Sequence, residues 1–419
     1  MTTSKLPRSV ARPRISLLAL AAIGPGILVM LADVDVGNVA TAALSGAHWG
    51  VRLLPLVLAL IPVLYIIQEL TVRLGIFTRQ GLGELVRARF GRAWSVVAGL
   101  ALLVVVIASL VTEFTGVAGV GEIYGVSRHL CVPLAAAALL LIGSSGSYRR
   151  IESITLWIGL FQLAFFAVAG AAHSDLHRVV LEMTDLPIGN SGFWFLGAAL
   201  IGATFNPWMM FYQQSAVVEK ALGERNLWLS RAETAFGAAL AQLLTAAVLY
   251  AGAISFGPYG FDGELETVGQ ISRAMTPLLG PSLGPLVFSA GVLGASMVAA
   301  VVCSLALAWG IGELFGIRRD LEHHPGRLRW FFVVYAAGVT GAAAIVLLFQ
   351  NLLWLNIVAQ VVNVFMLPLI LAFLIILAKM ALPERCRLRG WYLWLTVGLS
   401  VATCACGLIG AMQGVFGNG

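Results

Sequence analysis

Charged residues are scarce in this sequence: Asp, Glu, Lys and Arg make up only 11% of its 419 residues, whereas hydrophobic residues make up 59%. The mean hydropathy is +0.92. So few charges do not cover the surface of a soluble globule of this size. The composition therefore excludes an ordinary soluble protein and predicts a polytopic protein embedded in a lipid bilayer.

The cysteine and histidine patterns of metalloenzymes are missing as well. The five cysteines show no paired metal-ligand spacing, and the chain has no His-Glu-x-x-His pattern. The histidines lie in predicted loops or at the ends of predicted spans: His48, His129, His173, His177, His323 and His324. An intramembrane metalloprotease would have no visible zinc ligands here. We therefore expect a protein that is not an enzyme and has no cofactor.

A cleavable signal pattern is the third absence. Lys5, Arg8, Arg12 and Arg14 precede a full-length apolar span instead of a short apolar core that ends in a cleavage site. We therefore expect residues 1–15 to form a cytosolic N-terminal tail.

Apolar runs bounded by glycine, proline and charged residues predict eleven membrane spans. They lie near residues 16–47, 54–74, 94–124, 130–146, 151–172, 193–219, 228–256, 278–315, 330–349, 352–380 and 390–416. With a cytosolic N-terminus, this count places all of the 26 Lys and Arg except Arg52, Arg128, Arg178 and Arg273 in cytosolic segments. Basic residues concentrate on the cytosolic side of membrane proteins. The C-terminus is thus expected outside, and the net charge of +6 reflects orientation, with no nucleic-acid partner.

Two of the predicted spans are interrupted by polar residues and helix breakers. Asp33-Val34-Asp35-Val36-Gly37-Asn38 breaks the first span, and Ala203-Thr204-Phe205-Asn206-Pro207-Trp208 breaks the sixth. A charged side chain at mid-bilayer is unfavourable by roughly 2.5–3.5 kcal/mol, so it is kept where it faces an ion or a cavity. We predict that Asp35, Asn38 and Asn206 surround one cation, with the freed carbonyls of Ala32 and Ala203 facing the same point. The alternative is a pair of kinked structural helices, but a kink alone does not require two carboxylates and an amide together.

The ordinal positions of the two breaks predict the architecture. Breaks in the first and sixth spans favour an all-α fold with a five-plus-five inverted repeat and an eleventh transmembrane helix, in which the broken helices meet at the midplane. The chain 1–419 then forms a single transmembrane transporter domain. Its first repeat is expected over 16–172, its second over 193–380, and the extra helix over 390–416.

The order and spacing of these motifs resemble the Nramp divalent-metal transporters, whose fold is of the LeuT type. The matching residues are Gly24-Pro25-Gly26, Asp35-Val36-Gly37-Asn38, Gln68, Leu74-Gly75, Thr112-Glu113, Gly202-Ala203-Thr204, Pro207, Gln360-Val361-Val362 and Leu367-Pro368. The resemblance implies that Gln360 approaches the ion late in the transport cycle. A structural interhelical hydrogen bond is an equally good account of Gln360.

Three departures from the family pattern bear on the ion. Asn206-Pro207-Trp208 stands where the family has Met-Pro-His, Val36 where it has proline, and Asp33 where it usually has an aromatic residue. The family's thioether is a soft ligand that favours manganese, iron and cadmium over magnesium and calcium, whereas an asparagine offers a hard amide oxygen that suits Mg²⁺. Asp33 adds a carboxylate and room for water. The pattern is most similar to the Nramp-related magnesium transporters, a bacterial branch of the family.

The family's proton route is incomplete in this sequence. Gly116 stands where the family has a second carboxylate one turn from that of Glu113, and Trp208 stands where it has a histidine. The ninth predicted span has no buried base where the family has an arginine. Only Glu113 remains as a possible titratable group, and a structural, hydrogen-bonded acid is an equal account of it.

These features favour a secondary-type transporter that imports Mg²⁺, and also Mn²⁺, by alternating access without proton coupling. The alternative is a proton-coupled Mn²⁺ or Fe²⁺ importer of the Nramp type. An amino-acid transporter of the same fold fits the acidic pair poorly, because a substrate carboxylate prefers helix N-termini without acidic neighbours. We expect a monomer in a bacterial inner membrane. Glu69, Glu122 and Glu313 lie near span ends and are expected to reach the membrane interface.

Overall fold

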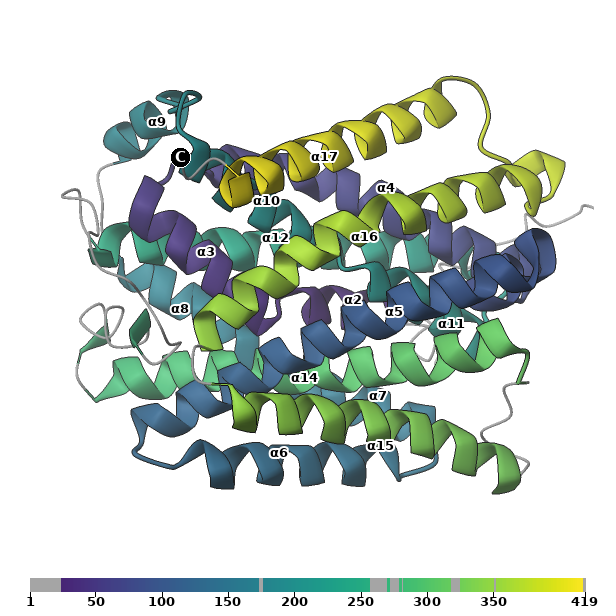
Figure 1. Cartoon of the computed structure of the whole chain (residues 1–419). Coiled ribbons are helices and arrows are strands. Elements are labelled where there is room, and N and C mark those ends of the chain that lie inside the picture. The colour runs from purple at the N-terminus through teal and green to yellow at the C-terminus, as the bar shows by residue number, and fades with distance from the viewer. Residues whose placement is uncertain are drawn as a thin grey trace, which may run out of the picture.

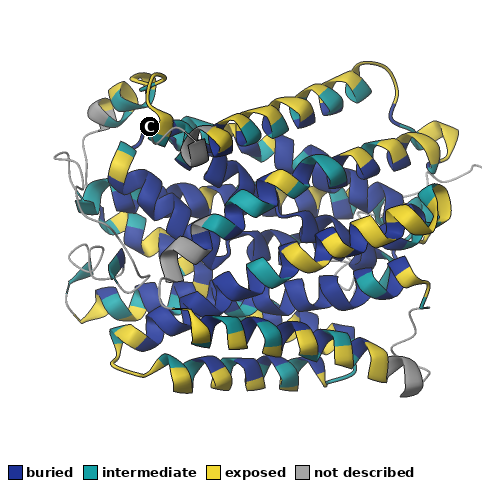
Figure 2. Cartoon of the chain, in the orientation of Figure 1, coloured by how far each residue is buried: buried dark blue, intermediate teal, exposed yellow. Residues whose placement is uncertain are grey.

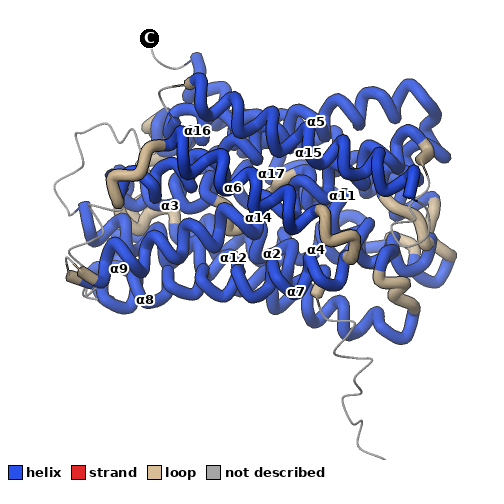
Figure 3. The backbone as a smooth tube through the Cα atoms, turned by 90° about the horizontal axis from the view of Figure 1, so that it is seen from below, coloured by secondary structure: helices blue, strands red, loops and turns tan. Residues whose placement is uncertain are grey.

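The computed structural model describes residues 24–172, 176–256, 270–271, 279–280, 282–317, 325–349 and 352–416. Within these ranges the chain is helical apart from short connections (Figures 1 and 3). The expected tail 1–15 and the loop with His323 and His324 lie outside the described residues.

The helices follow one another along the chain as α2 (Pro25–Asp33), α3 (Val36–Trp49), α4 (Leu54–Thr78), α5 (Leu82–Ile123), α6 (Arg128–Gly143), α7 (Tyr148–Gly159), η1 (Leu160–Leu163), α8 (Ala164–Ala171), α9 (Leu176–Thr184), α10 (Ser191–Thr204), α11 (Pro207–Glu219), η2 (Glu224–Asn226), α12 (Leu227–Phe256), α14 (Leu283–Phe315), α15 (Pro325–Leu348), α16 (Leu352–Met380), η3 (Glu384–Cys386) and α17 (Gly390–Phe416). The bounds of α12, α16 and α17 agree with the expected spans to within a residue.

The described helices account for a multi-pass membrane protein. Eight helical stretches are long and apolar enough to cross a membrane, and the bent pair α2 and α3 makes a ninth. The other two expected spans coincide with α6, which has 16 residues, and with α10 and α11, which have 14 and 13. By length and apolarity alone, the described part of the chain therefore has up to nine spans where the sequence predicted eleven, because α6 is shorter than the others and the broken sixth span leaves two short helices.

Helix α5 begins earlier than expected. It starts at Leu82, whereas the third span was expected from residue 94. Glu84 caps this helix, since its side chain accepts a hydrogen bond of 2.9 Å from the backbone N–H of Gly81. Gly91 has φ = 84°, a conformation that favours glycine, and it bends the chain between the first turns and the long apolar segment.

Burial increases from the outer helices toward the centre of the bundle (Figure 2). Helix α14 packs against α5, α11 and α15 and is buried along most of its apolar stretch. Helix α17 and the α7 to α8 stretch are mostly accessible and carry large apolar side chains such as Trp157 and Val401. An apolar outer surface of this kind is what the bilayer requires. Both broken helices lie inside it.

Two of the three glutamates expected at the interface are buried instead. Glu69 accepts hydrogen bonds from Arg73 at 2.5 Å and from Arg231 at 2.7 Å. Glu313 accepts from the backbone N–H of Gly83 at 2.9 Å and from Ser215 at 2.6 Å. Each carboxylate is stabilised by groups from another helix. The sequence of the span that carries the glutamate does not indicate these partners. Glu122 is exposed, as expected.

Candidate metal site at the two helix breaks

The first break separates α2 from α3, whose axes meet at 47°. Asp35 is the N-cap of α3, and its Oδ1 accepts a hydrogen bond of 2.7 Å from the backbone N–H of Asn38. Aspartate is a favoured N-cap because its side chain satisfies an N–H that has no partner within the helix. Asp33, the last residue of α2, and Asp35 are both fully buried. The break thus places two carboxylates inside the bundle.

The second break separates α10 from α11. Pro207 occupies the first turn of α11, where its missing N–H has no helical partner to lose. Asn206 is the N-cap residue, and its Nδ2 donates a hydrogen bond of 3.0 Å to the carbonyl of Ala203. Both residues are fully buried. Two of the predicted ligands, the Ala203 carbonyl and the Asn206 side chain, are therefore hydrogen-bonded to each other.

Helix α16 connects the two breaks. Asn363 Nδ2 donates to Asn206 Oδ1 at 2.6 Å and to Gln360 Oε1 at 3.1 Å. The Gln360 Nε2 atom lies so close to Gly37 that a Cβ at position 37 would overlap it. The backbone carbonyl of Gln360 lies close to Gly202 of α10, where a Cβ would also overlap it. The predicted residue Gln360 is thus in contact with both broken helices, and Gly37 is required there by this close approach.

The acidic oxygens at the first break lack partners. Among the described side chains, both oxygens of Asp33 and the Oδ2 of Asp35 are buried without a hydrogen bond. Asp33 lies within electrostatic range of Asp35 and of the Asn206 amide. Adjacent buried carboxyl groups with unpartnered oxygens are strongly unfavourable in their ionised form unless a cation lies between them, and without a cation they take up protons instead. The arrangement therefore fits a divalent cation bound as substrate.

The available donors at this position are oxygens. No group of three or more His, Cys, Asp and Glu side chains with metal-binding proximity occurs in the described ranges. A cation here would draw on carboxylate, amide and carbonyl oxygens, which are the ligands of hard ions such as Mg²⁺ and are also accepted by Mn²⁺.

Several predicted ligands are occupied by protein hydrogen bonds. Asn38 Oδ1 accepts from Thr245 Oγ1 at 2.8 Å. Ala32 is buried in the last turn of α2, and the carbonyl of its neighbour Leu31 accepts from Gln162 Nε2 at 2.9 Å. A cation bound to Asn38 Oδ1, Asn206 Oδ1 or the Ala203 carbonyl would share that oxygen with the hydrogen bond it accepts, or displace the bond. That Asn38, Asn206, Ala203, Ala32 and Gln360 are metal ligands remains a prediction.

Packed side chains occupy the positions of this chain that match the family's proton route. Glu113 is buried beside Asp35, and its Oε2 accepts from the backbone N–H of Val36 at 3.4 Å. A Cβ on Gly116 would overlap Val36, so the described packing leaves no space there for a second carboxylate. Trp208 is fully buried and donates a hydrogen bond of 3.0 Å from Nε1 to Ser109 Oγ.

A polar cluster that the sequence did not predict holds the N-terminal end of α2. We call it the basal network: Gly24, Tyr148, Glu152, Tyr212, Lys220 and Glu233. Glu233 Oε1 accepts from the backbone N–H of Gly24 at 2.6 Å, and Lys220 pairs with Glu152 at 2.8 Å. Gly24 has φ = 153°, and a Cβ there would overlap Glu152. The ends of α2, α7, α11 and α12 are thus joined at one point.

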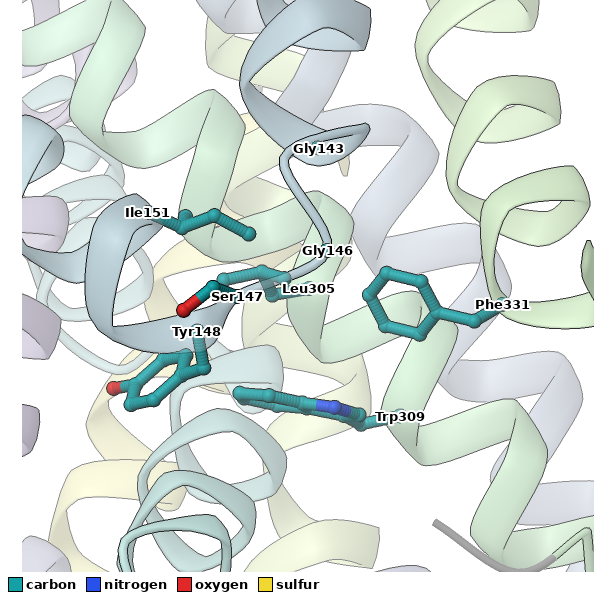
Figure 4. A pocket seen from close by; sticks show the side chains of 8 residues that line it. All are labelled: Gly143, Gly146, Ser147, Tyr148, Ile151, Leu305, Trp309 and Phe331. Atoms are coloured by element: carbon teal, nitrogen blue, oxygen red, sulfur yellow. The ribbon is translucent and has the colours of Figure 1, made fainter. Parts of the chain in front are cut away.

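Aromatic rings continue the basal network toward α14. The Tyr148 and Tyr212 hydroxyls are hydrogen-bonded at 3.0 Å, and Trp309 stacks on Tyr212 with ring centroids 5.7 Å apart. Figure 4 shows Tyr148 and Trp309 side by side below the turn that joins α6 to α7. These rings link the basal network to α14.

Solved structures place this fold in a known class. A manganese transporter from Eremococcus coleocola matches with a TM-score of 0.76 at 18% identity, over 98% of this chain and 91% of that chain. A Na⁺-coupled sialic acid symporter matches with a TM-score of 0.59 at 13% identity, over 94% and 89%. With its two broken helices, the chain therefore has the LeuT-type fold of membrane transporters, as predicted.

Sequence comparison gives the family. The model described as "Natural resistance-associated macrophage protein-like", which defines Nramp, matches residues 26–413, so the chain belongs to the Nramp family. A relative named "Divalent metal cation transporter MntH" from Mesorhizobium japonicum is 26% identical over 302 residues, or 68% of this chain and 66% of that protein. A protein of the same name from Yersinia pestis is 29% identical over 300 residues, or 69% and 72%. The match thus spans just under two thirds of the first relative.

Proposed function

We propose that this protein transports divalent metal cations across a membrane by alternating access. The observation that carries the proposal is the pair of buried carboxylates, Asp33 and Asp35, whose unpartnered oxygens lie where the two broken helices meet. Membership of the Nramp family and the names of the relatives support it. The fold supports it as well, because paired broken helices bind substrates at the midplane of transporters.

The comparisons favour manganese over magnesium as the ion. The relatives are named divalent metal cation transporters, and one structural neighbour is a manganese transporter. For the identity of the ion, they therefore support the second of the two functions inferred from the sequence, the proton-coupled Mn²⁺ or Fe²⁺ importer of the Nramp type, better than the first. We propose Mn²⁺ as a transported ion. Mg²⁺ is the second candidate, and the oxygen donors at the breaks, with Asn206 in place of a thioether, favour it.

Proton coupling is a separate part of the proposal. The packing of Gly116 against Val36 and the burial of Trp208, which is not titratable, support transport without protons.

The membrane location is a further part of the proposal. The bacterial relatives support an inner membrane, where we expect a cytosolic N-terminus, an external C-terminus and a monomer.

Flux measurements test the proposed function. The full chain is reconstituted in liposomes, and entry of Mn²⁺, Mg²⁺, Ca²⁺ and Cd²⁺ is followed with and without a proton gradient. We expect Mn²⁺ entry that Asp35→Ala abolishes while the variant keeps its elution profile and helix content. Absence of flux for every ion, or undiminished flux in the folded variant, would contradict the proposal. Mg²⁺ entry that competes with Mn²⁺ would support the second ion.

A further inference from the structure

An apolar groove runs along the outside of the bundle beside α2. It has a volume of about 520 Å³. Its walls come from α2, α7, η1 and α12 and include Ile27, Leu31, Ser153, Leu156, Trp157, Leu160 and Phe236. Helix α2 packs against both α7 and α12, and all three helices contribute residues to the groove.

The groove opens toward the lipid. Trp157 is 70% exposed, Phe236 61% and Leu160 51%, and all three belong to membrane-crossing stretches. Exposed apolar surface at that depth faces hydrocarbon instead of water. The natural occupant of a long apolar groove in such a position is an acyl chain.

Two arginines lie one helical turn before Ser153, the first residue of α7 that lines the groove. Arg149 and Arg150 are exposed in the first turn of α7. They precede Ser153 by four and three residues, and residues at this spacing lie on one face of a helix. Arg149 is also within electrostatic range of Glu152. The groove therefore has an apolar length and a basic end, which is the complement of a phospholipid with an anionic headgroup.

We propose that this groove binds one anionic phospholipid, with an acyl chain along Leu156, Leu160 and Phe236 and the headgroup phosphate on Arg149 and Arg150. The lipid contacts Ile27 and Leu31, which belong to the first half of the broken helix. It therefore stabilises the position of α2 in which the basal network is formed.

Native mass spectrometry of the full chain released from nanodiscs tests the proposal, with phosphatidylglycerol and phosphatidylcholine as competing probes. We expect retention of phosphatidylglycerol to fall about tenfold in Arg149→Gln/Arg150→Gln, because each interfacial basic residue contributes separately to anionic-lipid binding. Arg89→Gln/Arg92→Gln removes the same charge from exposed positions of α5 and is the matched control.

A second pair of variants tests the groove itself. Ser153→Trp places a ring inside it, whereas Ile154→Trp places the same ring on an adjacent exposed residue that does not line it. We expect Ser153→Trp to displace the lipid and Ile154→Trp to retain it. The proposal is overturned if phosphatidylcholine is retained equally, if the control variants lose the lipid as well, or if Ser153→Trp binds it normally. No arm depends on transport, so the outcome is independent of the proposed function.

Discussion

Glu233 accepts a hydrogen bond of 2.6 Å from the backbone N–H of Gly24, 209 positions earlier in the chain. The same oxygen accepts from Ile27 N–H at 3.0 Å. A side chain of α12 therefore caps the helix whose other end carries Asp33. Because a carboxylate at a helix N-terminus satisfies free N–H groups and the helix dipole together, this contact fixes the start of α2.

Loss of this cap should release α2. Glu233→Ala removes an interaction of about 0.5–2 kcal/mol, which shifts a two-state equilibrium roughly 2- to 30-fold toward an undocked α2. In a background without the native cysteines, Leu28→Cys on α2 is fully buried. We expect a membrane-impermeant maleimide to label it faster from the side of the basal network when Glu233→Ala is added. Glu84→Ala, which removes the cap of α5, is the control and should leave labelling unchanged. Equal labelling in all three proteins would show that Glu233 does not hold α2.

The charge of Asp35 should matter more than its shape. Asp35→Asn keeps an acceptor for the Asn38 N–H, which the aspartate binds at 2.7 Å, but removes the negative charge. We expect Mn²⁺ flux to fall at least about tenfold, because a bond to a charged group is worth roughly 1.5–3 kcal/mol. Thermal unfolding should stay close to that of the original protein. Flux near the original level would remove Asp35 from the ion site.

Local signals account for what the sequence predicted well. An aspartate N-cap at Asp35 and a proline in the first turn of α11 mark helix starts without any knowledge of the fold. The breaks therefore lie where the sequence placed them, and Asp33, Asp35 and Asn206 are found at their ends. Two breaks in corresponding positions were enough to indicate the class of fold.

Contacts between distant segments account for what the sequence missed. Thr245 binds Asn38 across 207 positions, and Gln162 binds the Leu31 carbonyl across 131. Each is a lone polar residue in an apolar run, which signals a buried partner but not its identity. Glu69 shows the opposite error, since its place near a span end indicated the interface while Arg73 and Arg231 hold it inside.

Proton movement should not accompany metal uptake. Gly116 has no space for a side chain and Trp208 is not titratable, so Glu113 has no described partner at those two positions. With a pH-sensitive dye inside liposomes and potassium plus valinomycin to balance charge, Mn²⁺ entry should leave the internal pH unchanged. Stoichiometric acidification would establish the proton-coupled alternative. A loss of that acidification in Glu113→Gln would then identify the carrier of the proton.

Ion selectivity should depend on the side chain at position 206. Asn206 Oδ1 accepts from Asn363 at 2.6 Å and Asn206 Nδ2 donates to the Ala203 carbonyl, so Asn206→Met removes both bonds and introduces a thioether. A soft thioether favours Cd²⁺, is tolerated by Mn²⁺ and does not replace an oxygen ligand for Mg²⁺. We expect the ratio of Cd²⁺ to Mg²⁺ flux to rise in Asn206→Met. Asn206→Leu is the control, because leucine has a volume similar to that of methionine but no sulfur. It should lower the flux of every ion, because Asn363 loses its partner at a stability cost of about 1–3 kcal/mol and no new ligand replaces the amide oxygen. The shift should be partial, since the Asp33 carboxylate persists beside the site. If Asn206→Met and Asn206→Leu have the same flux ratios, or if the original protein carries Cd²⁺ and excludes Mg²⁺, then the amide oxygen does not set the preference for hard ions.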